Sequence, residues 1–215
     1  SMVKFSLSTD VYPTVHAEAL ASKLAERLGI RTPKASSMRL GDKFALVTER
    51  FDRSGGARRM MVSGLTLSGL GEMASRYGTY PLLLERLNQH TVDPAGTARE
   101  IFERIAFNMA ISNNDDHLRN HAAFWDGKHL ELTPAYDLAP SARRPDAEMT
   151  LTLAYGEDGQ KLANLNQLIS ASNIYGLSRK DAGEVVDRIR KVIEAELDDA
   201  ADEMEIGSAD LAIIR

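Results

Sequence analysis

The sequence contains no cysteine, no long apolar run and no excess of positive charge. Without cysteine, neither disulfides nor thiolate metal ligands are possible, which fits a reducing cytoplasm. No apolar stretch approaches the roughly twenty residues that a membrane span needs, and no signal peptide precedes the first predicted helix. The net charge of −5 argues against direct, non-specific binding to nucleic acid. We therefore expect a cytoplasmic protein with no membrane partner.

What the chain does have is enough apolar residues for a sizeable core. Its 215 residues are 43% hydrophobic, an ordinary value for a globular protein. This length suits one large domain, or one domain plus a remnant of another.

The most polar stretch of the sequence is 112–120, and Asp137 follows it. Burying so many acids and amides without partners would be costly, so packing does not explain them. Phosphoryl transfer uses the same residue types: one carboxylate orients the attacking hydroxyl, while an Asn and a second Asp hold Mg²⁺. Asp115 and Asn120 have the Asp-x-x-x-x-Asn spacing of a kinase catalytic loop, and Asp137 follows a predicted hairpin where a second metal-binding Asp would stand. The pattern therefore favours phosphoryl transfer.

Two other interpretations of this loop stay open. Clusters of Asp and Asn after helices are commonly caps and turns, although the spacing and the second Asp after two strands weaken that explanation here. Alternatively, a metal-dependent hydrolase would use Asp115, Asp116, His117 and His121. The two histidines are four residues apart, which on a helix would put both on one face, but this loop is predicted to enter a strand.

The first fifty residues are predicted to form a small unit of strands and one helix. Lys4 lies in a short strand, where a solvent-facing side chain is the simplest interpretation and a lysine that contacts nucleotide phosphates is the functional one. A helix opens at Pro13 and closes at Gly29. Its Glu18 lies off the apolar stripe; a surface carboxylate is the commoner case, but kinases place here the glutamate that pairs with the strand lysine. A hairpin over 36–50 leads to a glycine-containing crossing.

The remainder is predicted to be mainly helical. An Asp-Pro pair at 93–94 begins a strongly amphipathic helix that delivers the polar loop. Two short strands, at about 122–125 and 130–132, form a hairpin, and 149–153 is predicted as a further strand. Ser178 caps a long C-terminal helix.

With these residues in view, the sequence resembles the HipA family of bacterial serine/threonine kinase toxins. The segments 48–53, 114–120 and 132–138 carry the resemblance, which covers essentially the whole chain. It implies an α+β, protein-kinase-like fold, with a truncated small N-lobe sheet in residues 1–53 and a mostly helical C-lobe, containing the catalytic loop, in residues 54–215.

The resemblance also implies roles for the matching positions. Asp115 would be the catalytic base, Asn120 and Asp137 would hold Mg²⁺, and Lys4 would contact the phosphates of ATP. The other implied nucleotide-binding positions are Glu49, Arg50 and Phe51 at the hinge that meets adenine, Tyr136 beside the nucleotide, and His117, Leu118 and Arg119 beside the phosphates. The implied partners are a helix-turn-helix antitoxin, which alone would contact DNA, and a protein substrate, for which aminoacyl-tRNA synthetases are the family's example.

The sequence departs from the family pattern in one respect. No glycine-rich phosphate loop precedes Lys4, whereas family members carry that loop and an N-terminal subdomain. Backbone N–H groups of such a loop cradle the phosphates, so we expect nucleotide binding to be weak or absent and the chain to be the C-terminal part of a kinase. The competing hypothesis is a non-catalytic, pseudokinase-like module that binds an antitoxin or a target protein.

Overall fold

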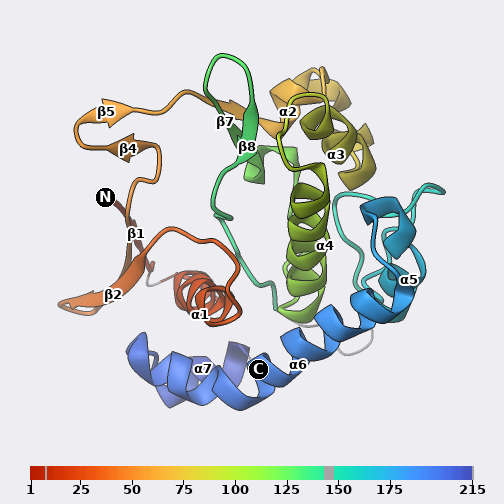
Figure 1. The fold of residues 1–215 in the computed structure, drawn as a ribbon. Helices are drawn as coiled ribbons and strands as arrows, with labels where there is room; N and C mark the ends of the chain where they lie inside the picture. Colours follow the sequence, from red (N-terminus) through yellow and green to blue (C-terminus); the bar gives the residue numbers. More distant parts are fainter. Residues whose placement is uncertain (8, 143–147, 215) are drawn as a thin grey trace.

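A small antiparallel sheet with one helix against it begins the chain, and a larger, mostly helical part follows (Figure 1). This computed structural model describes residues 1–7, 9–142 and 148–214. The first sheet contains β1 (Met2–Phe5), β2 (Ala35–Leu40) and β3 (Lys43–Thr48) in the order β1-β3-β2. The predicted hairpin is confirmed, and Gly41 makes its turn with φ of +65°.

The register of this sheet sets the direction of Lys4. Lys4 pairs with Leu46 across the β1–β3 ladder, and cross-strand partners point to the same face of a sheet. Leu46 is buried in the core that the sheet shares with α1 (Thr14–Arg27), so Lys4 points to the side of that helix. His16 of α1 stacks on Phe44 of β3, with ring centroids 3.9 Å apart.

Helix α1 packs against the long helix α6 (Arg179–Glu203), which passes beneath it in Figure 1. The α1 helix ends as predicted at Gly29, whose φ of +76° suits glycine. Near that end, Arg27 forms ion pairs with Glu196 and Glu203 of α6, and Lys23 forms a second pair with Glu203. The first helix is therefore held by the last long one through both packing and charge.

The core of the larger part surrounds α4 (Pro94–Ala110), the central vertical helix of Figure 1. The Asp93 side chain accepts a hydrogen bond from the backbone N–H of Gly96, which confirms the predicted start. Ile101, Phe102 and Ile105 on this helix are completely buried. Helix α3 (Tyr80–Asn88) and α6 pack against it, so the polar loop that follows α4 starts from a rigid support.

A second three-stranded sheet receives the chain after the polar loop. Its order is β6-β7-β8, from β6 (Met61–Ser63), β7 (Ala122–Trp125) and β8 (Leu130–Leu132), and both predicted strands of the hairpin are confirmed. The remaining elements are β4 (Arg53–Ser54), β5 (Ala57–Arg58), α2 (Gly64–Leu67), the 3-10 helices Glu72–Tyr77, Leu118–Asn120 and Ser172–Tyr175, α5 (Leu165–Ser170) and α7 (Ser208–Ile214).

The strand predicted at 149–153 is wrong. Thr150 makes one isolated bridge with Leu162, and Leu151 donates its backbone N–H to Lys161 without forming a ladder. Leu151 and Leu153 are buried in the core, so their alternation reflects packing of an irregular segment. Within the described residues, no helix is both long and apolar enough to cross a bilayer.

Candidate active site

The Lys4 ammonium lies between two carboxylates from distant parts of the chain. Its Nζ donates to Glu18 Oε1 and Oε2 at 2.6 and 2.8 Å, and to Asp137 Oδ1 at 2.7 Å. Lys4 comes from β1, Glu18 from α1, and Asp137 from the segment after β8. Glu18 is only 7% exposed, so the interpretation of Glu18 as a surface carboxylate is wrong. The Lys4 side chain is 46% exposed, as the solvent-facing interpretation expects, but its charge is paired rather than free.

The electrostatics of this trio keep Lys4 charged. Burial lowers the pKa of the Lys4 ammonium, but its hydrogen bonds to Asp137 and Glu18 outweigh burial, so the pKa is raised. Burial also raises the pKa of the Glu18 carboxyl, because Lys4 offsets only part of the cost of removing that group from water. The trio therefore presents a fixed cation beside the partly exposed carboxylate of Asp137.

Hydrogen bonds on both sides of Asp137 hold its segment against the polar loop. On one side, the Tyr136 hydroxyl donates to the backbone carbonyl of Arg119 at 2.7 Å, and burial raises the pKa of Tyr136 to about 12, so this donor stays protonated. On the other side, Ser141 donates its backbone N–H to Ser112 and its hydroxyl to Asn114 Oδ1. Asp137 itself has a φ of +59°, an uncommon value for a residue other than glycine that aspartate tolerates better than most.

Within the loop, exposed and buried residues alternate from position 115 onward. Asp115 and Arg119 are exposed, whereas Asp116, Leu118 and Asn120 are buried. No described residue donates a hydrogen bond to the Asp115 carboxylate, which leaves it available to a ligand. This is the arrangement that a general base needs, because its acceptor must be free when a substrate hydroxyl arrives.

Asp116, by contrast, is the buried anchor of the loop. Its Oδ2 accepts hydrogen bonds from the Tyr80 hydroxyl at 2.5 Å and from Asn108 Nδ2 at 2.8 Å, and it lies 3.0 Å from His121 Nε2. Burial raises the pKa of Asp116, but the His121 charge and these hydrogen bonds outweigh it, so the pKa is lowered. The sequence analysis considered Asp116 and His121 only as ligands of a hydrolase metal and missed Tyr80 and Asn108. No local sequence signal at Tyr80 or Asn108 predicts that their side chains meet at Asp116.

The predicted hinge lies where β3 ends. Glu49 donates its backbone N–H to Lys34 O, and Arg50 pairs with Asp52, whose pKa this guanidinium lowers to about 2. The Phe51 ring lies 5.6 Å from that of Tyr136, centroid to centroid. The structure thus brings together the two aromatic residues that were predicted beside the nucleotide.

The other predicted phosphate neighbours have different surroundings. Arg119 pairs with Glu72 at 2.7 Å on the surface. The Nδ1 atom of His117 is buried and has no hydrogen-bond partner in the described part of the chain. The Leu118 side chain packs against Gly78, where an added Cβ would lie 2.5 Å from Leu118 Cδ1. Because that side chain is buried, any contact of Leu118 with a nucleotide would have to come from its backbone.

The donor set fits Mg²⁺ better than a metal that needs several histidines or carboxylates. Across the described ranges, no group of three or more His, Asp or Glu side chains is placed to hold a metal. Asp137 Oδ2 and the Asn120 side chain have no hydrogen-bond partner among the described residues. Mg²⁺ is usually held by one or two carboxylates together with phosphate oxygens and water, so Asp137 and Asn120 suit it. The hydrolase hypothesis loses support, since His121 Nε2 already contacts Asp116.

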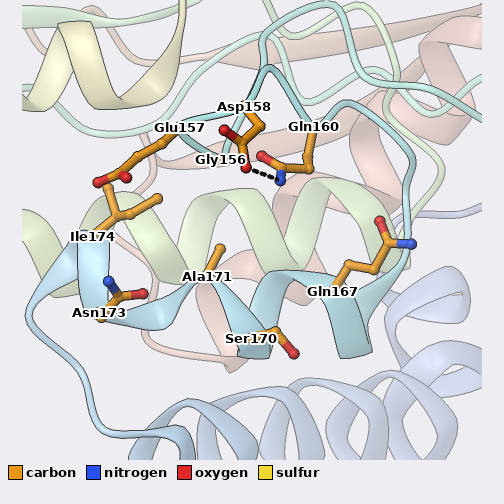
Figure 2. Close-up of a pocket in the computed structure, with 9 residues that line it drawn as sticks. All are labelled: Gly156, Glu157, Asp158, Gln160, Gln167, Ser170, Ala171, Asn173 and Ile174. Carbon is orange, nitrogen blue, oxygen red and sulfur yellow. Dashed lines mark hydrogen bonds between the residues drawn. The ribbon is translucent and has the colours of Figure 1, made fainter.

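A separate cavity of about 400 Å³ lies between the 156–160 loop and the α5 region (Figure 2). Figure 2 shows Glu157, Asp158 and Gln160 above it, with Ala171 and Ile174 on the opposite side. None of the residues predicted for nucleotide or metal binding lines this cavity. It is therefore not part of the candidate active site.

Comparison with solved structures defines the fold as that of a kinase. The chain matches HipA from the Shewanella oneidensis HipA, HipB and operator DNA complex with a TM-score of 0.77 and 23% identity, covering 99% of this chain and 54% of that one. It matches the Helicobacter pylori proinflammatory kinase CtkA with a TM-score of 0.57 and 14% identity, covering 95% and 90% of the two chains. The α+β, kinase-like fold predicted from the sequence is confirmed.

Two curated proteins are similar to the chain in sequence. One, from Haemophilus influenzae, is named "Putative kinase" and is 27% identical over 164 residues, which are 68% of this chain and 47% of that protein. The other, "Putative kinase Y4mE" from Sinorhizobium fredii, is 24% identical over 153 residues, covering 67% and 36%. The chain thus spans less than half the length of these relatives.

The family follows from the sequence profile described as HipA-like C-terminal domain, which matches residues 1–197. The chain belongs to this family, as the resemblance of its three motifs predicted.

Proposed function

We propose that this chain carries the catalytic machinery of a HipA-like serine/threonine protein kinase, which transfers a phosphoryl group from Mg·ATP to a protein hydroxyl. The observation that carries the proposal is the position of Lys4 between Glu18 and Asp137. A half-exposed surface salt bridge contributes little to stability, so stability alone gives little reason to bury Glu18. In a kinase, the lysine–glutamate pair has a purpose, because it aims the ammonium at the phosphates.

Each remaining side chain has a role in this mechanism. Asp115 accepts a hydrogen bond from the substrate hydroxyl and takes its proton as the new O–P bond to the γ-phosphorus forms and the bond to ADP breaks. Asn120 and Asp137 hold Mg²⁺, which when bound offsets negative charge on the phosphates. Lys4 contacts the phosphates of ATP, and Phe51 and Tyr136 lie beside the nucleotide.

The proposed partners follow from the relatives. The Shewanella protein is described in a toxin–antitoxin complex with HipB and operator DNA. By analogy, we propose a helix-turn-helix antitoxin as partner of this chain, with DNA reached only through that antitoxin. A protein with an accessible Ser or Thr would be the substrate, encountered in the cytoplasm.

The test of the proposed chemistry is the substitution Asp115→Asn. Since Asp115 acts only on the hydroxyl, the variant should bind Mg·ATP within about twofold of the parent and lose at least about 100-fold in ADP formation. Calorimetry measures the binding, and release of ADP from Mg·ATP, with label transferred to protein, measures the chemistry. Asp158→Asn, an exposed carboxylate at the cavity of Figure 2, is the matched control and should change neither. Unchanged ADP formation by Asp115→Asn would exclude Asp115 as the base.

A further inference from the structure

Asp115 and Asp116 are neighbours with opposite environments. Asp115 is exposed, whereas Asp116 is 3% exposed, and three donors converge on its single oxygen Oδ2. Exposure alternates along residues 115–120, so neighbouring side chains in this stretch point to opposite sides of the loop. Fixing the Asp116 side chain inward therefore fixes the direction in which Asp115 points outward.

The three donors come from three different elements. Tyr80 lies in the first turn of α3, Asn108 in the last turns of α4, and His121 just before β7. Tyr80, Asn108 and His121 are 0%, 2% and 2% exposed, so water competes little for these bonds. Asn108 extends the network, since its Oδ1 accepts from Asn113 Nδ2 at 3.0 Å. The Asp116 carboxylate thus joins the loop to helices α3 and α4, and also to His121, the residue just before β7.

An apolar contact holds the same loop two residues further on. Leu118 is 2% exposed and packs against Gly78, while the backbone N–H of Gly64 donates to His121 O at 2.7 Å. The loop is therefore held by the hydrogen bonds of Asp116 and by the packing of Leu118. Asp115 directly precedes Asp116.

We infer that Asp116, with its donor Tyr80, is the positioning residue of the proposed active site: it fixes the direction of Asp115 without touching substrate. This inference rests on the proposed kinase function. A buried carboxylate with three donors should be rigid, and rigidity is what a general base needs to meet a hydroxyl at hydrogen-bond distance. Replacing the carboxylate or its donor should therefore lower kcat more than it changes KM for ATP.

The decisive comparison uses two buried tyrosines that each donate one hydrogen bond. Tyr80 donates to Asp116, and Tyr175 donates to the backbone carbonyl of Tyr155 at 2.7 Å; Tyr175 is 1% exposed, and among the described residues no hydrogen bond joins its side chain to residues 112–121. Tyr80→Phe and Tyr175→Phe should lower Tm by similar amounts. Only Tyr80→Phe should lower kcat for ADP formation, by about 10- to 100-fold, measured well below both Tm values. KM for ATP should stay within about twofold in both variants.

Asp116→Asn provides the second measurement, because it keeps the shape of the side chain and removes its charge. It should lower kcat at least as much as Tyr80→Phe while the chain remains folded. If the parent forms ADP and both variants keep its kcat within about twofold, the positioning role is wrong and the network is only structural. If the parent itself forms no ADP with Mg·ATP, it is the proposed function that fails.

Discussion

Lys4 Nζ lies 2.7 Å from Asp137 Oδ1, although the two residues are 133 positions apart in the sequence. The first strand of the chain and the segment after β8 therefore meet at one ion pair. Glu18 completes the contact from α1, so three separate elements must be correctly placed for the site to exist.

Lys4→Met should weaken Mg·ATP binding by at least about 10-fold, because it removes the cation proposed to contact the phosphates. Calorimetric titration with Mg·ATP measures this loss. Lys43→Met is the matched control, since Lys43 is an exposed lysine at the start of β3 in the same sheet and should leave binding unchanged. Equal affinities of Lys4→Met and the parent would remove Lys4 from the nucleotide site.

Gly64→Ala should destabilise the chain by about 1–3 kcal/mol. A Cβ at this position would lie 2.7 Å from the backbone oxygen of Leu118, and backbone cannot give way as a flexible side chain can. Gly183→Ala is the control, because nothing lies within 4 Å of its added Cβ on helix α6, where alanine should be neutral or stabilising by up to about 1 kcal/mol. Urea unfolding measures both, and an equal effect of the two substitutions would mean that the loop is not tightly packed on α2.

The ion pairs between α1 and α6 predict a pH dependence of stability. Hydrogen bonds from Lys23 and then Arg27 lower the pKa of Glu203 below its usual value of 4.5. A carboxyl whose pKa is lower in the folded state than in the unfolded chain stabilises the fold when the pH is above its unfolded-state pKa. This stabilisation is lost as the pH falls through the folded-state pKa. The difference in Tm between the parent and Glu203→Gln should therefore be largest above pH 4.5 and shrink below it. A difference that stays constant through this range would contradict the pairing.

Much of the fold could be predicted because its signals are local. The helix after Asp93 and the hairpin 122–132 have caps, turns and periodicities that neighbouring residues alone determine. The spacing of Asp115 and Asn120 likewise predicts a catalytic loop from local sequence alone, since both residues lie within one short segment. The failed strand at 149–153 shows the limit of such signals, because buried apolar residues also alternate in irregular segments that pack against a core.

The parts that could not be predicted depend on contacts between distant residues. Whether Glu18 is a surface carboxylate or the partner of Lys4 is decided by where the sheet places β1 against α1. Asp116 and Asp115 are chemically identical in the sequence, but the folded chain brings Tyr80, Asn108 and His121 to Asp116 and none of them to Asp115. Contacts between residues so far apart in the sequence produce no periodic pattern from which they could be predicted.

The most direct test of the central claim is the thermal stability of this chain with Mg·ATP, compared with Mg²⁺ alone and with the variant Asp137→Asn. A ligand that binds only the native state raises Tm, so the account predicts a rise with Mg·ATP at millimolar concentration, none with Mg²⁺ alone, and a much smaller rise in Asp137→Asn. No rise in the parent would contradict a working nucleotide site and favour a non-catalytic module that binds an antitoxin or a target protein. An equal rise in Asp137→Asn would contradict the metal-binding role of Asp137.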